Sequence, residues 1–112
     1  MKLLVVAPPY VSLRDVDNAV FASGYRFDEV VIGDHNEPAE AWAEQAWAEH
    51  YSFPVCHMNS HGTDLETLAK RMVDYADAAV IVCDCDDELV HAVHSAAIDV
   101  DMVYFLTHAF TV

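Results

Sequence analysis

The chain has 112 residues, 54% of them apolar, and its 19 acidic residues outnumber its 5 basic ones, which gives a formal net charge of −14 at pH 7. This charge argues against direct nucleic-acid binding through phosphate contacts, because an acidic surface repels the backbone. The length suits one domain over residues 1–112, and no apolar stretch reaches the roughly 18 residues of a transmembrane helix, so we expect no membrane partner.

Five short apolar runs predict the strands of a sheet. Runs that are apolar throughout are typical of strands buried on both faces. The segment from Met1 to Ala7 contains the first run and lacks the basic, apolar and small-residue order of a signal peptide, so we expect a cytoplasmic protein. The runs are Leu3–Val6, Val30–Ile32, Phe53–Cys56, Ala79–Cys83 and Met102–Leu106.

Segments with helical periodicity separate these runs. Strict βαβαβαβαβ alternation predicts an α/β fold with a five-stranded parallel sheet and helices on both faces. This is a Rossmann-like three-layer sandwich, for which we expect the strand order 3-2-1-4-5. The predicted helices are Leu13–Ala22, Pro38–His50, Asp64–Tyr75 and Asp87–Ala97.

The second predicted helix carries an apolar stripe that we expect to face the sheet. Trp47 lies about 140° around the helix from Trp42, so it is expected to pack against a neighbouring helix or a partner. Apolar residues on the outer helices, Trp47 among them, permit a homodimer. The stripe recurs at steps of three and four residues and consists of Ala39, Trp42, Ala43, Ala46 and His50.

The turn after the second strand is the first candidate for a ligand site. The apolar run breaks at Gly33 and restarts as a helix, for which Asn36 is a candidate cap. In parallel α/β proteins, helix amides and the helix dipole converge on ligands at such turns. A phosphate-binding loop needs several glycines, whereas this turn has one glycine followed by Asp34, His35, Asn36 and Glu37.

In an open parallel sheet the ligand crevice lies beyond the carboxyl ends of the strands, where the strand order reverses. If the first and fourth strands are neighbours, loops after several strands line it. We expect Tyr10 to stack on a base, amides near Gly33 to hold a polar group, and Asn59 or His61 to close over it. The expected lining is Pro8, Pro9, Tyr10, Val11, Gly33 to Glu37 and Asp84 to Glu88, and the residues expected to overhang it after the third strand are His57, Asn59, His61 and Gly62.

The segment Asp84 to Glu88 is the densest acidic cluster and has two interpretations. At least two of its side chains are expected to serve the amino end of the next helix. Alternatively, the carboxylates of this segment form a magnesium site that would let a phosphate approach an otherwise repulsive wall. Asp84 and Asp86 are expected to be ligand-binding residues, and no individual residue is assigned as a metal ligand. His91 and His94 share a helix face by their spacing, which is only a weak indication of zinc.

Several local patterns are similar to one known family. The segment Ala43–His50 leading to Phe53–Val55 resembles an alanine- and tryptophan-containing helix and the strand after it, and Arg71–Val82 resembles a methionine-containing helix end and the next strand. On these patterns the whole chain resembles the SLOG superfamily, a Rossmann-like group, and especially its short YspA-like branch. The resemblance implies binding of nucleotides or nucleotide-derived signals, and in some members cleavage of N-glycosidic bonds.

The chain departs from that family where the family binds phosphate. The family's glycine-serine-arginine turn is replaced here by Ala7-Pro8-Pro9, and its glycine-threonine turn is replaced by the acidic segment from Asp84. The family's glycine-rich turn corresponds to the region from Asp34 to Glu40, which contains no glycine. An arginine-asparagine pair aligns with Leu68 and Ala69. The resemblance therefore implies the architecture and ligand binding more strongly than it implies catalysis.

Three functions follow as hypotheses. The first is a non-catalytic cytoplasmic module that binds or senses a nucleotide-derived small molecule, with magnesium as an optional cofactor. The second is an acidic interaction or inhibitor protein, of the kind that phages encode or that mimics nucleic acid, with a basic protein partner. The third is a nucleoside or nucleotide N-glycosidase in which Glu40 or Asp84 is the acid–base carboxylate. The acidity alone is also explained by solubility or by a high-salt source.

Overall fold

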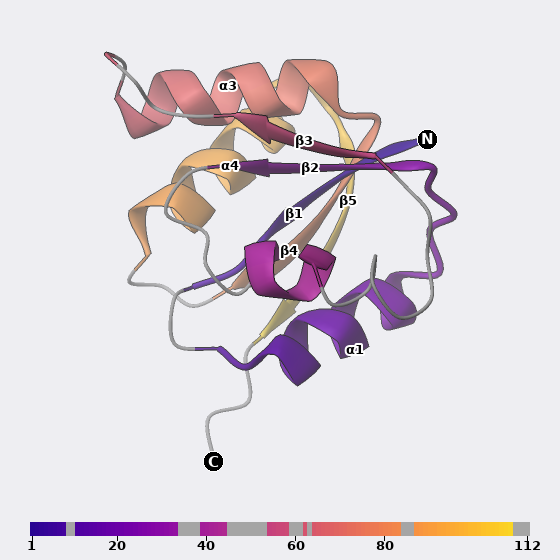
Figure 1. The fold of residues 1–112 in the computed structure, drawn as a ribbon. Helices are drawn as coiled ribbons and strands as arrows, with labels where there is room; N and C mark the ends of the chain where they lie inside the picture. Colours follow the sequence, from indigo (N-terminus) through magenta and orange to yellow (C-terminus); the bar gives the residue numbers. More distant parts are fainter. Residues whose placement is uncertain are drawn as a thin grey trace.

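The computed structural model describes residues 1–8, 11–33, 39–44, 54–58, 62, 64–83 and 87–108. These residues form one sheet of five strands in the order β3-β2-β1-β4-β5, and every neighbouring pair is parallel (Figure 1). The predicted α/β fold and strand order are confirmed. The strands are β1 (Lys2–Val6), β2 (Glu29–Gly33), β3 (Val55–Met58), β4 (Ala78–Cys83) and β5 (Val103–His108).

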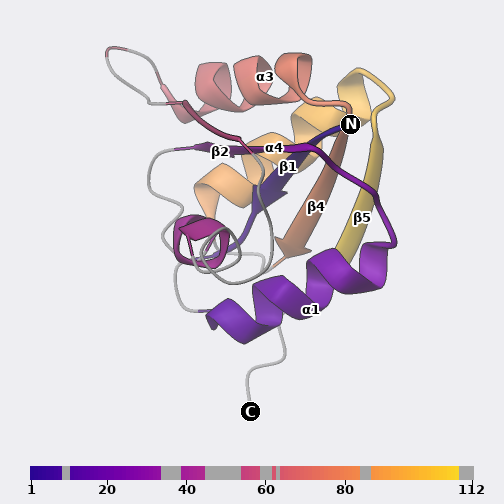
Figure 2. The same ribbon diagram turned by 45° about the vertical axis from the view of Figure 1, so that its right-hand side comes forward.

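Helices cover both faces of the sheet (Figures 1 and 2). Helix α1 (Leu13–Ser23) and helical residues 39–44 pack on one face, and α3 (Leu65–Tyr75) and α4 (Glu88–Asp99) pack on the other. Among the described residues, no helix is long and apolar enough to cross a membrane.

Alternation along β1 divides the core between the two faces. Leu3 and Val5 belong to the cluster with α1, whereas Leu4 and Val6 belong to the cluster with α3 and α4. All four side chains are fully buried. A central strand buried on both sides is therefore the reason that the first apolar run of the sequence is uninterrupted.

The stripe predicted for the second helix is confirmed at the three positions that the structure describes. Ala39, Trp42 and Ala43 are buried in the cluster that also holds α1. Ala46, Trp47, His50 and the candidate cap Asn36 lie outside the described residues.

Strand β3 is shifted relative to its prediction, since it starts at Val55 and continues to Met58. Pro54 explains the later start, because a proline has no amide to donate to the ladder. Its carbonyl is nevertheless used and accepts a hydrogen bond from Val30 N at 3.0 Å. Strand β5 likewise starts one residue after the predicted Met102 and extends to His108.

Candidate functional site

The site predicted from the sequence requires that β1 and β4 are neighbours in the sheet. The structure shows this pairing. Leu3 pairs with Ala78 and Val6 pairs with Ile81 in parallel register. From β1 the sheet continues through β2 to β3 on one side, and from β4 it continues to β5 on the other. The strand order therefore reverses between β1 and β4, the point at which open α/β sheets hold ligands beyond their carboxyl ends.

Of the predicted ligand-binding residues, Gly33 is the one that the structure describes. Loop positions around the same sheet edge lie outside the described residues, and their roles stay predictions. These are Pro9, Tyr10, Asp34, His35, Asn36, Glu37, Asn59, His61, Asp84 and Asp86.

Gly33 has a packing role in addition to any role toward a ligand. It ends β2 in a buried position, and a Cβ atom built there would lie 2.7 Å from Met72 Sδ and 3.6 Å from Leu68 Cδ2 of α3. That separation from the sulfur is well inside van der Waals contact. The glycine therefore lets α3 approach the end of β2, which explains the residue type without a phosphate.

Val11 does not line the crevice, contrary to the expectation from the sequence. It is 8% exposed and belongs to the core cluster that contains α1. The cause is its apolar side chain, which packs with the buried residues of α1 and the sheet. Val11 N donates a hydrogen bond to Pro8 O at 3.3 Å. Pro8 is itself buried.

Glu40 and His57 form a polar pair at the outer side of the same sheet edge. Glu40 Oε1 lies 3.9 Å from His57 Nδ1, and their side chains are 35% and 56% exposed. His57 belongs to β3, which is an edge strand of the sheet, and β2 lies between β3 and β1. A carboxylate at Glu40 therefore lies beside the edge strand and not directly at the β1–β4 switch point.

The acidic segment before α4 is explained in part by capping. Asp87 is the N-cap and its Oδ1 accepts a hydrogen bond from Val90 N at 2.9 Å, and Glu88 occupies the first turn. Two of the five residues thus serve the helix, as expected. No group of three or more possible metal ligands occurs among the described residues, which do not include Asp84 and Asp86.

His91 and His94 have separate surroundings although they lie three residues apart on α4. The His94 ring meets the Tyr104 ring of β5 nearly edge-on, with 5.3 Å between centroids and 70° between planes. His91 instead borders a groove between α3 and α4. Their spacing therefore reflects the packing of the helix against β5 and α3.

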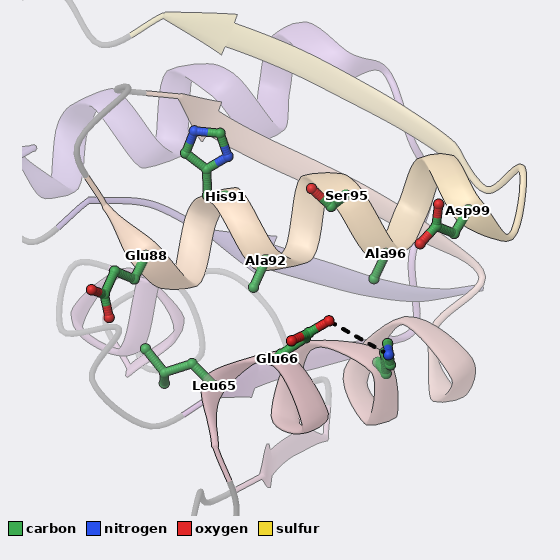
Figure 3. Close-up of a pocket in the computed structure, with 9 residues that line it drawn as sticks. Leu65, Glu66, Glu88, His91, Ala92, Ser95, Ala96 and Asp99 are labelled. Atoms are coloured by element: carbon green, nitrogen blue, oxygen red, sulfur yellow. Dashed lines mark ion pairs between the residues drawn. The ribbon is translucent and has the colours of Figure 1, made fainter.

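The groove between α3 and α4 has a volume of about 360 Å³ (Figure 3). Ala92 and Ala96 of α4 line the groove and point toward α3. Glu66 and Lys70 of α3 form an ion pair at 3.7 Å. Sequence reasoning missed this groove because it depends on the pairing of two helices that have no shared motif. Its lining is completed by Leu65, Glu88, His91, Ser95 and Asp99.

A larger pocket of about 480 Å³ lies between α1, the turn that follows it and the helical residue Trp42. We call it the aromatic pocket. Sequence reasoning missed it, although the three aromatic residues at the end of α1 and just after it were a visible signal. Its lining is Asp17, Val20, Phe21, Gly24, Tyr25, Arg26, Phe27 and Trp42.

Comparison of the chain with protein-family models, with curated proteins and with solved structures returned no match. The functional argument therefore rests on the fold, on the residues above and on the local sequence patterns.

Proposed function

We propose that this protein is a small Rossmann-like module that binds or senses a nucleotide-derived small molecule, and that it is not an enzyme. The observation that carries the proposal is the reversal of strand order between β1 and β4 in an all-parallel sheet. Ligands of open α/β sheets bind beyond the strand carboxyl ends at this point, because the diverging loops leave a crevice there. The similarity of local patterns to the SLOG superfamily supports the same class of ligand.

In this proposal the loops around the crevice supply the contacts. Tyr10 stacks on the base, and backbone amides from Gly33 to Glu37 hold a polar group. Asn59 or His61 closes over the ligand. Asp84 and Asp86 would hold a magnesium ion, which offsets the repulsion between a phosphate and a chain of net charge −14.

A thermal-shift screen tests the proposal. The panel contains nucleosides, nucleotides, ADP-ribose and cyclic dinucleotides, each with and without magnesium. A ligand that binds the folded state at 100 times its Kd stabilises it by about 2.7 kcal/mol, which is a clear rise in Tm. Mass spectrometry of small molecules released from the purified protein by denaturation identifies a ligand that co-purifies.

Variants locate the effect. Tyr10→Ala should remove the shift, and Asp84→Asn with Asp86→Asn should remove its dependence on magnesium. Asp74→Asn with Asp101→Asn is the matched control for the double variant, because it removes the same two negative charges from exposed positions. A panel without any shift, or shifts that persist in Tyr10→Ala, would contradict the proposed site.

A second candidate function is an acidic interaction or inhibitor protein for a basic partner. The groove between α3 and α4 favours it, since Glu66, Glu88 and Asp99 border the groove whereas Lys70 is its one basic side chain among the described residues. Lys70 is moreover paired with Glu66. The partner would place lysine or arginine side chains across these helices.

The two functions are separated by salt and by charge variants. A basic partner should bind at moderate salt and dissociate at high salt, because exposed charges are screened. Glu66→Gln, Glu88→Gln and Asp99→Asn together should abolish capture of that partner. A triple control with the same charge change, Glu44→Gln, Asp74→Asn and Asp101→Asn, should retain it. Equal loss in both triple variants would exclude the groove as the interface.

The N-glycosidase alternative involves one described residue, Glu40, whose pairing with His57 places it beside β3. We expect no release of base from nucleoside monophosphates. Turnover by the wild type that is lost in Glu40→Gln would replace the proposed binding function by an enzymatic one.

A further inference from the structure

The aromatic pocket has walls suited to an organic cation. Phe27 and Trp42 meet at an angle, with ring centroids 6.2 Å apart and 59° between planes. Phe21 is 87% exposed at the rim, and Tyr25 is partly buried on the turn after α1. Burial raises the pKa of the Tyr25 hydroxyl. Trp42 is only 2% exposed and packs with Phe27, so the accessible rings are those of Phe21, Tyr25 and Phe27. The negative faces of aromatic rings attract cations.

A carboxylate stands beside these rings. Asp17 Oδ1 accepts a hydrogen bond from Trp42 Nε1 at 3.1 Å. This bond satisfies the indole and fixes the carboxylate, while among the described residues Asp17 has no further partner. The acid therefore adds a negative charge to the pocket at a point where the ring system already favours a cation.

Arg26 adds a second polar feature on the turn that follows α1. It is exposed and is one of only 5 basic residues, yet it forms no ion pair within the described part of the chain. Asp17 and Gly24 are separated by roughly 10 Å along α1, at about 1.5 Å per residue. The positive guanidinium and the negative carboxylate are thus attached near different ends of the pocket.

From this arrangement we propose that the aromatic pocket is a binding site for a small aliphatic zwitterion with a methylated ammonium head and a carboxylate tail. The head lies against the rings beside Asp17, and the tail reaches the guanidinium of Arg26. The volume of about 480 Å³ is within the range of small-molecule sites. This site is separate from the sheet-edge crevice and does not depend on the function proposed for it.

Three probes test the proposal by calorimetry. The zwitterion is ω-trimethylammonio-hexanoate. Its carbon isostere has a tert-butyl head of the same shape without charge, and hexyltrimethylammonium keeps the head and lacks the carboxylate. We expect the zwitterion to bind about tenfold more tightly than the isostere, because the cation–π attraction of a partly desolvated head has this size. It should also bind several-fold more tightly than hexyltrimethylammonium.

Exposed side chains provide variants that leave the fold intact. Asp17→Asn retains an acceptor for Trp42 and should weaken the zwitterion about fivefold, and Phe21→Ala should weaken it about threefold. Arg26→Gln should abolish the preference over hexyltrimethylammonium, whereas Arg26→Lys retains part of it. Arg14→Gln is the matched control, since it removes the same charge from an exposed position of α1 that does not line the pocket.

Each remaining outcome overturns the proposal. Equal affinity for the zwitterion and its carbon isostere would mean that the pocket does not recognise the charge. Absence of binding to all three probes, or equal effects of Arg14→Gln and Arg26→Gln, would exclude the site. Nucleotide binding at the sheet edge should be unaffected by any of these variants, so failure here is distinguishable from failure of the proposed function.

Discussion

Met72 occupies the space in which a side chain at Gly33 would lie, since a Cβ atom there would be 2.7 Å from the Met72 sulfur. Met72 is fully buried, so its thioether has little room to move although it is flexible. Helix α3 therefore packs closely against the end of β2 because Gly33 has no side chain there.

Gly33→Ala should lower the free energy of unfolding by about 1–2 kcal/mol, the usual cost of an extra methyl group in a packed core. Urea unfolding measures it. In a Met72→Ala background the same substitution should cost close to nothing, because the opposing thioether is gone. An unchanged cost in that background would show that the effect has another origin.

Asp17→Ala should destabilise the protein by about 1 kcal/mol, because it removes the acceptor of the Trp42 indole. Asp17→Asn should be nearly neutral, since an amide oxygen also accepts. Trp42→Phe should cost about 1–3 kcal/mol through lost volume and the lost bond. The double variant Asp17→Ala with Trp42→Phe should show a coupling free energy of about 1 kcal/mol. If the costs of the two single substitutions simply add, the hydrogen bond does not contribute to stability.

Tyr75→Phe should reduce the loss in the free energy of unfolding that the wild type shows as the pH rises above about 10. A hydrogen bond to Glu29 and burial raise the pKa of Tyr75 to about 12 from 10.0. The folded state thus holds the phenol proton more tightly than the unfolded state. Its contribution is fully present below pH 10 and is lost as pH rises to about 12. Chemical unfolding of wild type and variant across this range measures the difference, and parallel profiles would contradict it.

Asp87→Ala should cost about 1 kcal/mol through loss of the cap on α4. Asp87→Asn and Asp87→Ser should retain most of the stability, since both side chains can accept from the Val90 amide. Circular dichroism during thermal unfolding measures all three. If the three substitutions cost the same, the capping bond is not the source of the effect.

The fold could be predicted from the sequence because each central strand is buried on both faces. Because both faces of β1 and β4 are buried, these strands are continuous apolar runs in the sequence. The helical segments between successive strands indicate that the strands pair in parallel. The position of β3 was less well predicted, since a short apolar run around Pro54 gives little indication of where the ladder begins. Val11 was assigned to the crevice because it follows the first strand, whereas its side chain packs in the core cluster with α1, a contact that local sequence does not reveal.

The site was harder to predict than the fold. Gly33 was assigned to a ligand on the basis of its place after a strand, whereas its partner Met72 lies far away in the sequence. Both pockets join residues of separate elements, such as Asp17 with Trp42 and Glu66 with Asp99. Arrangements of this kind follow from the packing of helices on the sheet, which periodicity alone does not specify.

The pairing of Leu3 with Ala78 also sets the timing of folding. A strand near the start of the chain takes its second neighbour from well beyond the midpoint, so few of the central contacts are local. Domains dominated by distant pairings fold slowly, because long loops must close before their contacts form. During synthesis β1 and β2 emerge well before β4, the second neighbour of β1, and before β5, which completes the sheet. Their apolar side chains are therefore without their final partners until the second half of the chain has been made.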